Sequence, residues 1–171
     1  GDSHRYRGTE MDSLRIVPLG GLGEFGCNML AVEWGDNVIA VDCGVMFPSP
    51  DLLGIDLVIP DVSYLAEQGK TPQAIVLTHA HEDHIGALPY ILQRFQLPVY
   101  GTRLTLEFVR RRLREHGLEQ STELVEIIPG QRFSVGPFTI EGIPVTHSLV
   151  NCIALAIETP VGVIIHTGDF K

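Results

Sequence analysis

The sequence has few cysteines, and their spacing excludes a common stabilising device. Cys27, Cys43 and Cys152 are its three cysteines, far apart in 171 residues, and no two of them form a CxxC pair. An odd number of widely spaced thiols argues against a disulfide framework and favours a reducing, cytoplasmic setting. The cysteines are therefore expected to be small core residues.

Long apolar runs, repeats and low-complexity segments are also missing. No run approaches the roughly 20 apolar residues of a membrane span, and no basic, apolar and small-residue order marks a signal peptide. We therefore expect no membrane partner. Residues 1–10 are interpreted as a cloning remnant, with Met11 as the native start and 11–171 as one domain.

Basic residues are outnumbered, since 12 Lys and Arg stand against 21 Asp and Glu, a formal charge of −9. This balance ordinarily argues against a nucleic-acid partner, although a bound metal adds positive charge that such a count omits. The basic residues are unevenly placed, because Arg110, Arg111, Arg112 and Arg114 crowd one predicted helix. That run is either a solvated helix face or a phosphate-contacting patch, and composition does not settle the substrate.

The hydrophobic pattern predicts strands with helices inserted after some of them, which is an α/β protein of layered type. Thr102 is expected to cap a long helix, and Asp61 a short helix over 62–68. The predicted strands cover 14–19, 28–34, 38–41, 74–77, 98–100, 124–128, 132–135, 138–143, 152–158 and 161–166, and the other predicted helices cover 85–95 and 103–116.

One stretch, THAHEDH at 78–84, follows a buried apolar strand and precedes a helix. Imidazoles and carboxylates are natural ligands of zinc and similar divalent metals. His79 and His81 are two residues apart at a strand end and so point the same way. Asp83 and His84 at the turn into the helix can approach from another side. This geometry can supply ligands to two metal ions.

Three further residues lie just beyond predicted strands, and they extend this set. His147 and Asp169 are interpreted as additional metal ligands because the chain already carries HxHxDH. Asp42 is a candidate for holding a metal-bound histidine in place, with a turn or helix-cap aspartate as the alternative. His166, inside its strand, is expected to be structural.

A literal GxGxxG at 21–26 points to a different chemistry and is discounted. A dinucleotide site needs a helix directly after the glycines, so that the phosphates meet the helix N-terminus. Here a strand-like segment follows.

The HxHxDH stretch with His147 and Asp169 resembles the metallo-β-lactamase superfamily. More closely, the chain resembles the ribonuclease J family of its β-CASP branch. The matching segments are PLGGLGE at 18–24, GVMFPSPDLLGIDLVIPD at 44–61, LTHAHEDHIGALPY at 77–90, VTHS at 145–148 and HTGDFK at 166–171. The resemblance implies a four-layer αβ/βα sandwich with metals at one edge, of which this chain holds roughly the first half.

By the same resemblance, His79, His81 and His147 would hold one zinc ion, and Asp83 and His84 the second. Asp169 would bridge the two ions, which could also be manganese. Asp83 and Asp169 would hold the attacking hydroxide, and Asp42 would orient the histidine cluster.

The implied function is a metal-dependent ribonuclease of bacterial RNA processing, including ribosomal RNA, and decay. It would trim 5′-monophosphorylated RNA from 5′ to 3′ with some endonucleolytic cleavage, and the full-length protein is expected to be a homo-oligomer. One alternative is a hydrolase of small thioesters or lactones with the same fold. The segment at 44–61 favours the nuclease.

The sequence stops shortly after Asp169, whereas the family continues through the rest of the lactamase domain, a β-CASP domain and a further histidine ligand. Loss of the third and fourth layers is therefore expected. The chain would be weakly active or inactive and would self-associate through uncovered apolar surface. A catalytically silent metal-binding module is the other alternative.

Overall fold

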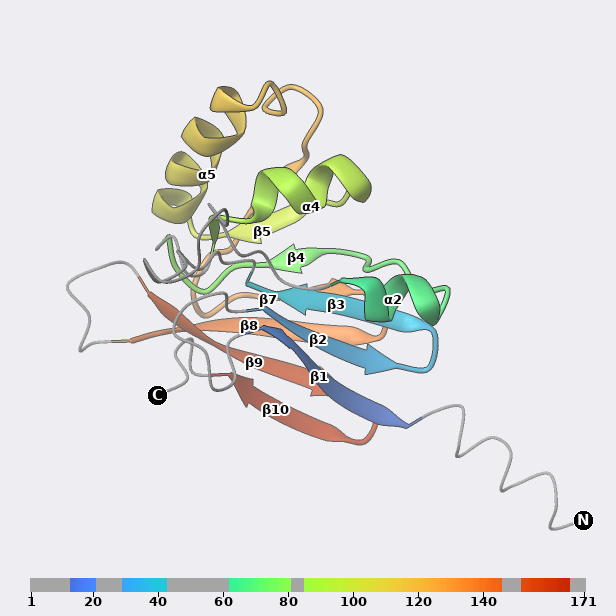
Figure 1. Cartoon of the computed structure of the whole chain (residues 1–171). Helices are drawn as coiled ribbons and strands as arrows, with labels where there is room; N and C mark the ends of the chain where they lie inside the picture. The colour runs from blue at the N-terminus through green and yellow to red at the C-terminus, as the bar shows by residue number, and fades with distance from the viewer. Residues whose placement is uncertain (1–12, 21–28, 43–61, 81–84, 146–151, 167–171) are drawn as a thin grey trace, which may run out of the picture.

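A computed structural model describes residues 13–20, 29–42, 62–80, 85–145 and 152–166 of the chain (Figure 1). In this part the chain forms two β-sheets and a set of helices. None of the described helices is long and apolar enough to cross a membrane.

The first sheet has six strands in the order β1-β2-β3-β4-β5-β6. The first three are antiparallel neighbours, whereas β3, β4, β5 and β6 run parallel. The strands are β1 (Leu14–Gly20), β2 (Met29–Trp34), β3 (Asn37–Val41), β4 (Ile75–Val76), β5 (Val99–Gly101) and β6 (Leu124–Glu126).

The described helices are α2 (Ser63–Glu67), α4 (Leu88–Arg94) and α5 (Arg103–Glu115). Thr102 caps α5 as predicted, because its side chain accepts a hydrogen bond from the amide of Thr105. The prediction that Asp61 caps the short helix, which is α2, is wrong. The cap is Val62, whose carbonyl accepts the first helical hydrogen bonds and whose side chain makes no capping bond.

The second sheet has four antiparallel strands in the order β10-β9-β8-β7. They are β7 (Arg132–Val135), β8 (Phe138–Pro144), β9 (Ile153–Thr159) and β10 (Gly162–His166). The expectation that the third layer is lost is therefore wrong. Two-residue turns pair β7 with β8 and β9 with β10 locally, so this sheet needs little chain to form.

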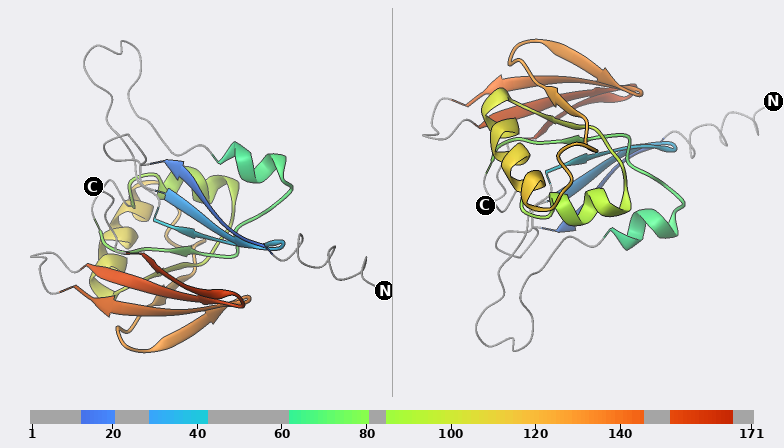
Figure 2. Two further views of the ribbon diagram at one scale, coloured as in Figure 1. Left: turned by 90° about the horizontal axis from the view of Figure 1, so that it is seen from below. Right: turned by 90° about the horizontal axis from the view of Figure 1, so that it is seen from above.

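Two hydrophobic cores define the layers. One lies between the helices and the six-stranded sheet, with Ala40, Ile75, Leu88 and Val109 among its residues. The other lies between the two sheets and includes Phe138. Figure 2 shows the four-stranded sheet facing the six-stranded one from the side opposite α2 and α4. Alternate residues of β3 enter different cores, as the two-residue period of a strand requires.

The outer face of the second sheet carries exposed apolar side chains. Ile143, Val163 and Ile165 lie on this face, and Val161 lies in the turn beside it. The exposed groups agree with the expectation of uncovered apolar surface, and self-association through them stays a prediction.

Candidate metal centre

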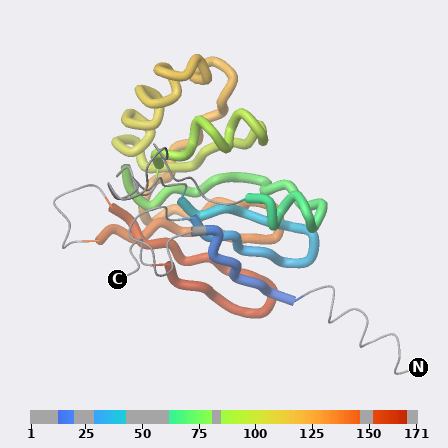
Figure 3. The backbone as a smooth tube through the Cα atoms, viewed as in Figure 1, coloured from blue at the N-terminus to red at the C-terminus, as the bar shows by residue number. Residues whose placement is uncertain are grey.

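Several strands end at one edge of the molecule, and the candidate site lies there. Because β3, β4 and β5 are parallel, their carboxyl ends share this edge (Figure 3). Asp42 directly follows β3, and Thr78 and His79 come shortly after β4. The sheet topology therefore brings Asp42 next to the start of the histidine stretch.

Asp42 is the anchor of this edge. Its side chain is buried, with the residue 1% exposed. It accepts hydrogen bonds from the amide of Thr78 at 2.8 Å and from the Thr78 hydroxyl at 2.8 and 3.0 Å. Its own amide donates to the carbonyl of Val76 at 2.9 Å. A carboxylate bonded in this way fixes the backbone immediately before His79.

The backbone of Asp42 adopts a left-handed conformation with φ of 63°. Among the described residues, Asp42 is the one residue other than glycine that does so. Aspartate tolerates this region better than most residues, but the conformation still costs about 1–3 kcal/mol. The hydrogen bonds to Thr78 hold it in place. The turn interpretation and the positioning interpretation of Asp42 are therefore compatible, because the turn at Asp42 is what presents its carboxylate to Thr78.

Thr78 also joins this edge to the second sheet. Its carbonyl accepts a hydrogen bond from the amide of Ile153 at 3.0 Å. Ile153 is the first residue of β9 and pairs with Pro144, the last residue of β8. The connection that carries His147 therefore leaves and rejoins the described chain at this edge. His147 itself lies outside the described residues.

β10 ends at the same edge, because its last residue, His166, pairs with Leu155 near the start of β9. His166 is 6% exposed and is the last residue of β10, and its structural role stays a prediction. Asp169 follows three residues later in the sequence and lies outside the described residues.

His79 lies directly after Thr78 and is 4% exposed. His81, Asp83 and His84 lie outside the described residues. In the described ranges, no three His, Cys, Asp or Glu side chains come together as a metal-binding group. The structure thus places His79 and Asp42, and the complete ligand set stays a prediction.

Sequence reasoning gave Thr78 no role of its own. The sequence offered only a weak indication of such a role. A threonine lies between a buried strand and the first histidine, and an aspartate lies at the end of another strand. Only the pairing of β3 with β4 shows that these two residues meet.

The GxGxxG segment lies outside the described residues, but the element after it is described. It is the strand β2, which pairs with β1 and β3. The expected strand is confirmed, whereas a dinucleotide site requires a helix at this place in the chain.

Comparison with known proteins decides the family. The profile of the metallo-beta-lactamase superfamily matches residues 22–171. The chain belongs to the metallo-β-lactamase superfamily. The α/β layers described above are those of a metallo-β-lactamase fold, as predicted.

Among curated proteins, this metallo-β-lactamase chain is similar to ribonuclease J of several bacteria. It is 48% identical to that of Helicobacter pylori over 160 residues, which is 93% of this chain and 23% of the relative. It is 43% identical to that of Thermus thermophilus over 172 residues, covering 96% of this chain and 30% of the relative. The chain thus spans less than a third of the length of these relatives.

Solved structures support the fold. The metallo-beta-lactamase fold protein YhfI from Bacillus subtilis matches with a TM-score of 0.63 and 22% identity, over 91% of this chain and 62% of that one. A protein of unknown function from Enterococcus faecalis matches with a TM-score of 0.66 and 22% identity, over 92% and 44%. At this level of identity the likeness concerns the fold alone.

Proposed function

We propose that this chain is part of a metal-dependent ribonuclease that cleaves RNA phosphodiester bonds. The observation that carries the proposal is the 48% identity to a ribonuclease J over 93% of the chain. The same identity favours RNA over the small thioesters and lactones that the sequence alone leaves open. Bacterial RNA processing and decay in the cytoplasm is the corresponding setting.

The donor chemistry at the edge fits divalent metal ions. A buried imidazole, His79, follows a backbone that a buried carboxylate fixes, and buried histidines and carboxylates together suit zinc or manganese. We propose that His79, His81 and His147 hold one ion, that Asp83 and His84 hold the other, and that Asp169 bridges them. When bound, such ions supply Lewis acidity for in-line attack on phosphorus.

The chain's own residues would then do the positioning. Asp42 fixes Thr78, which sets the direction in which the chain enters the histidine stretch. Thr78 in turn fixes the start of β9 through its carbonyl. Asp83 and Asp169 would orient the attacking water beside the scissile phosphate. Proximity and orientation of this kind account for a large share of rate enhancement in enzymes.

The substrate of the whole protein is proposed to be 5′-monophosphorylated RNA, trimmed from the 5′ end with some internal cleavage. Because the chain spans 23% to 30% of these relatives, we expect weak or no turnover from these 171 residues alone. We also propose that the full-length protein is a homo-oligomer.

Metal content tests the proposal directly. Elemental mass spectrometry on the chain purified without added metal should give close to two zinc ions per chain, and His81→Ala should lower that value strongly. The matched control is His116→Ala. His116 is the C-cap of α5, and its ring Nδ1 lies 3.2 Å from the carbonyl of Arg112, so this variant should keep the wild-type zinc content.

Unchanged zinc in His81→Ala would overturn the ligand assignment. Hydrolysis of lactones or thioesters, with no metal-dependent cleavage of 5′-monophosphorylated RNA by a longer form of the protein, would overturn the ribonuclease.

A further inference from the structure

We propose that the outward face of α5 binds single-stranded RNA, with Phe108 stacking on a base and Arg111 contacting the backbone. The identity of the ligand as RNA rests on the proposed function. The face itself is a property of α5, and it can be tested without metal and without catalysis.

The first observation is the charge of α5. Five arginines lie on it against two glutamates, in a chain whose formal charge is −9. A local excess of positive charge on an acidic protein marks a surface that attracts a polyanion. The arginines are Arg103, Arg110, Arg111, Arg112 and Arg114.

The second observation is an apolar stripe that the core does not use. Thr105, Leu106, Val109 and Leu113 are the residues that α5 buries. Leu104 and Phe108, one turn apart, are 45% and 43% exposed. Exposed large apolar side chains beside cations are unusual on a solvated helix and typical of single-stranded nucleic-acid surfaces, where aromatic rings stack on bases.

Arg111 links the charge to the aromatic ring. Its guanidinium carbon lies 6.0 Å from the centroid of the Phe108 ring. A planar guanidinium near an aromatic face is held by cation–π attraction, and it can still donate to phosphate oxygens. A base stacked on Phe108 would therefore have its backbone within reach of Arg111.

Two of the other arginines are already engaged. Arg114 makes two hydrogen bonds to the Glu119 carboxylate, at 2.8 and 3.0 Å. This contact lowers the pKa of Glu119 and raises that of Arg114. Arg112 donates to the carbonyl of Gly86 at 3.3 Å and lies 3.6 Å from Glu115.

The remaining arginines are free to bind. Among the described residues, Arg103, Arg110 and Arg111 form no ion pair within 4.0 Å. A groove of about 300 Å³ beside α5 is a poor path for RNA, because Glu107 and Glu126 line it together with Arg103 and Arg110. The next residue along the ridge formed by Leu104, Phe108 and Arg111 is Glu115, which lies 3.6 Å from Arg112. Because that carboxylate is already paired with a cation, we assign the RNA path to this ridge.

The position of the ridge suits a strand that leaves the candidate metal centre. α5 begins two residues after β5 ends, and the carboxyl end of β5 lies at the same edge as Thr78. Leu104 is nearest that edge, and Phe108 and Arg111 lie one and two turns farther along. The 13 residues of α5 extend roughly 20 Å. One side of the helix packs against β5, β6 and α4, and α5 lies at the margin of the molecule (Figure 1).

The test is fluorescence anisotropy of a fluorescein-labelled oligouridylate, titrated with the 171-residue chain in EDTA at several salt concentrations. Phe108→Ala should raise Kd by about fivefold or more, as loss of one stacked base does, and Phe108→Tyr should restore binding. Arg111→Gln should weaken binding and reduce the slope of log K against log salt by about 0.7, the value for one phosphate contact with a single strand.

Two matched controls separate this ridge from general charge. Arg114→Gln removes an arginine of the same helix that is paired with Glu119, and Arg132→Gln removes an exposed arginine of the second sheet. Both should bind within about twofold of wild type if phosphate contacts are made by the ridge. Thermal melting by circular dichroism should show every variant folded, since the altered side chains are exposed.

Several results would overturn the proposal. The first is that the wild-type chain does not bind the oligouridylate at low salt. The second is that the RNA affinity of Phe108→Ala equals that of the two control variants. The third is that Phe108→Ala changes the oligomeric state and leaves the RNA affinity unchanged. The last result, seen by sedimentation velocity, would make the ridge a protein interface.

The same design separates this proposal from the ribonuclease. Intact binding by the ridge with no metal-dependent cleavage in the longer protein counts against the ribonuclease alone. Metal-dependent cleavage with no effect of Phe108 or Arg111 on binding counts against the ridge alone.

Discussion

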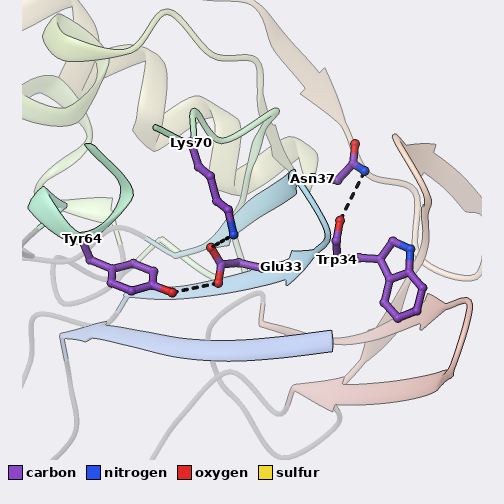
Figure 4. A network of polar contacts seen from close by, with 5 residues as sticks. All are labelled: Glu33, Trp34, Asn37, Tyr64 and Lys70. Atoms are coloured by element: carbon purple, nitrogen blue, oxygen red, sulfur yellow. Dashed lines mark hydrogen bonds and ion pairs between the residues drawn. The ribbon is translucent and has the colours of Figure 1, made fainter. Parts of the chain in front are cut away.

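Two buried carboxylates of the six-stranded sheet differ in how they are satisfied. Glu33, near the end of β2, and Asp42, just after β3, are each 1% exposed. Glu33 accepts hydrogen bonds from the Lys70 ammonium at 3.2 Å and the Tyr64 hydroxyl at 3.1 Å (Figure 4). Its charge is neutralised by a cation.

Asp42 lies at the opposite end of the β2–β3 pair, and the donors on Thr78 are neutral. These donors fix the position of the carboxylate relative to the histidine stretch. Glu33 therefore serves to hold α2 and the chain after it against the sheet, while Asp42 holds the backbone from which the histidine stretch begins. Burial alone does not distinguish a structural carboxylate from one beside the candidate metal centre.

The largest expected effect on stability follows from removing the cation next to Glu33. Lys70→Met should leave a buried carboxylate without its partner and reduce the free energy of unfolding by about 3–5 kcal/mol. Urea denaturation measures this loss. The double variant Glu33→Gln with Lys70→Met should recover much of the stability, and equal stability of Lys70→Met and wild type would show that Glu33 needs no cation.

A substitution at Asp42 is expected to have a smaller effect on stability but a clear effect on metal affinity. Asp42→Asn keeps an oxygen acceptor for Thr78 and removes the charge. Metal affinity should therefore fall about 10–100-fold, which is the usual cost of losing a residue that orients metal ligands. Competition with a chromogenic chelator measures it. Glu33→Gln is the matched control and should leave metal affinity unchanged. Equal losses in the two variants would remove the distinction between the carboxylates.

The smallest effect is expected at an ion pair of similar length in an exposed place. Arg132 and Glu158 lie 3.3 Å apart on the second sheet, with side chains 63% and 41% exposed. Arg132→Gln should change the free energy of unfolding by about 0–1 kcal/mol, because water screens exposed pairs. A loss in urea denaturation as large as that of Lys70→Met would show that distance, rather than burial, sets the strength.

Much of the fold follows from local patterns. The strand β7 and the helix α5 begin where the sequence predicts, and the cap at Thr102 is correct. The error at Asp61 arose because α2 begins at Ser63, one residue later than predicted, and its N-cap is Val62, a residue type that capping preferences do not favour. The second sheet was underestimated because its four strands pair with one another within the last third of the chain, two of the pairs through two-residue turns.

The candidate centre was predictable as a set of residue types and less so as a geometry. HxHxDH is visible in the sequence, and its family is shown by comparison. The bonds from Thr78 to Asp42 join residues 36 apart, and those from Tyr64 and Lys70 to Glu33 span 31 and 37 residues. No local periodicity encodes such contacts, because they depend on which strands become neighbours.

The bond between the Thr78 carbonyl and the Ile153 amide has a consequence for protein synthesis. All six strands of the first sheet are complete once Glu126 has been translated, so this sheet can form before the second sheet exists. Domains begin to fold while still on the ribosome. The histidine stretch and its hydrogen bonds to Asp42 are thus made early, but the bond that joins Thr78 to the second sheet forms only when β9 arrives. Metal loading of the nascent chain is expected to follow, and not to precede, the emergence of β9 from the ribosome.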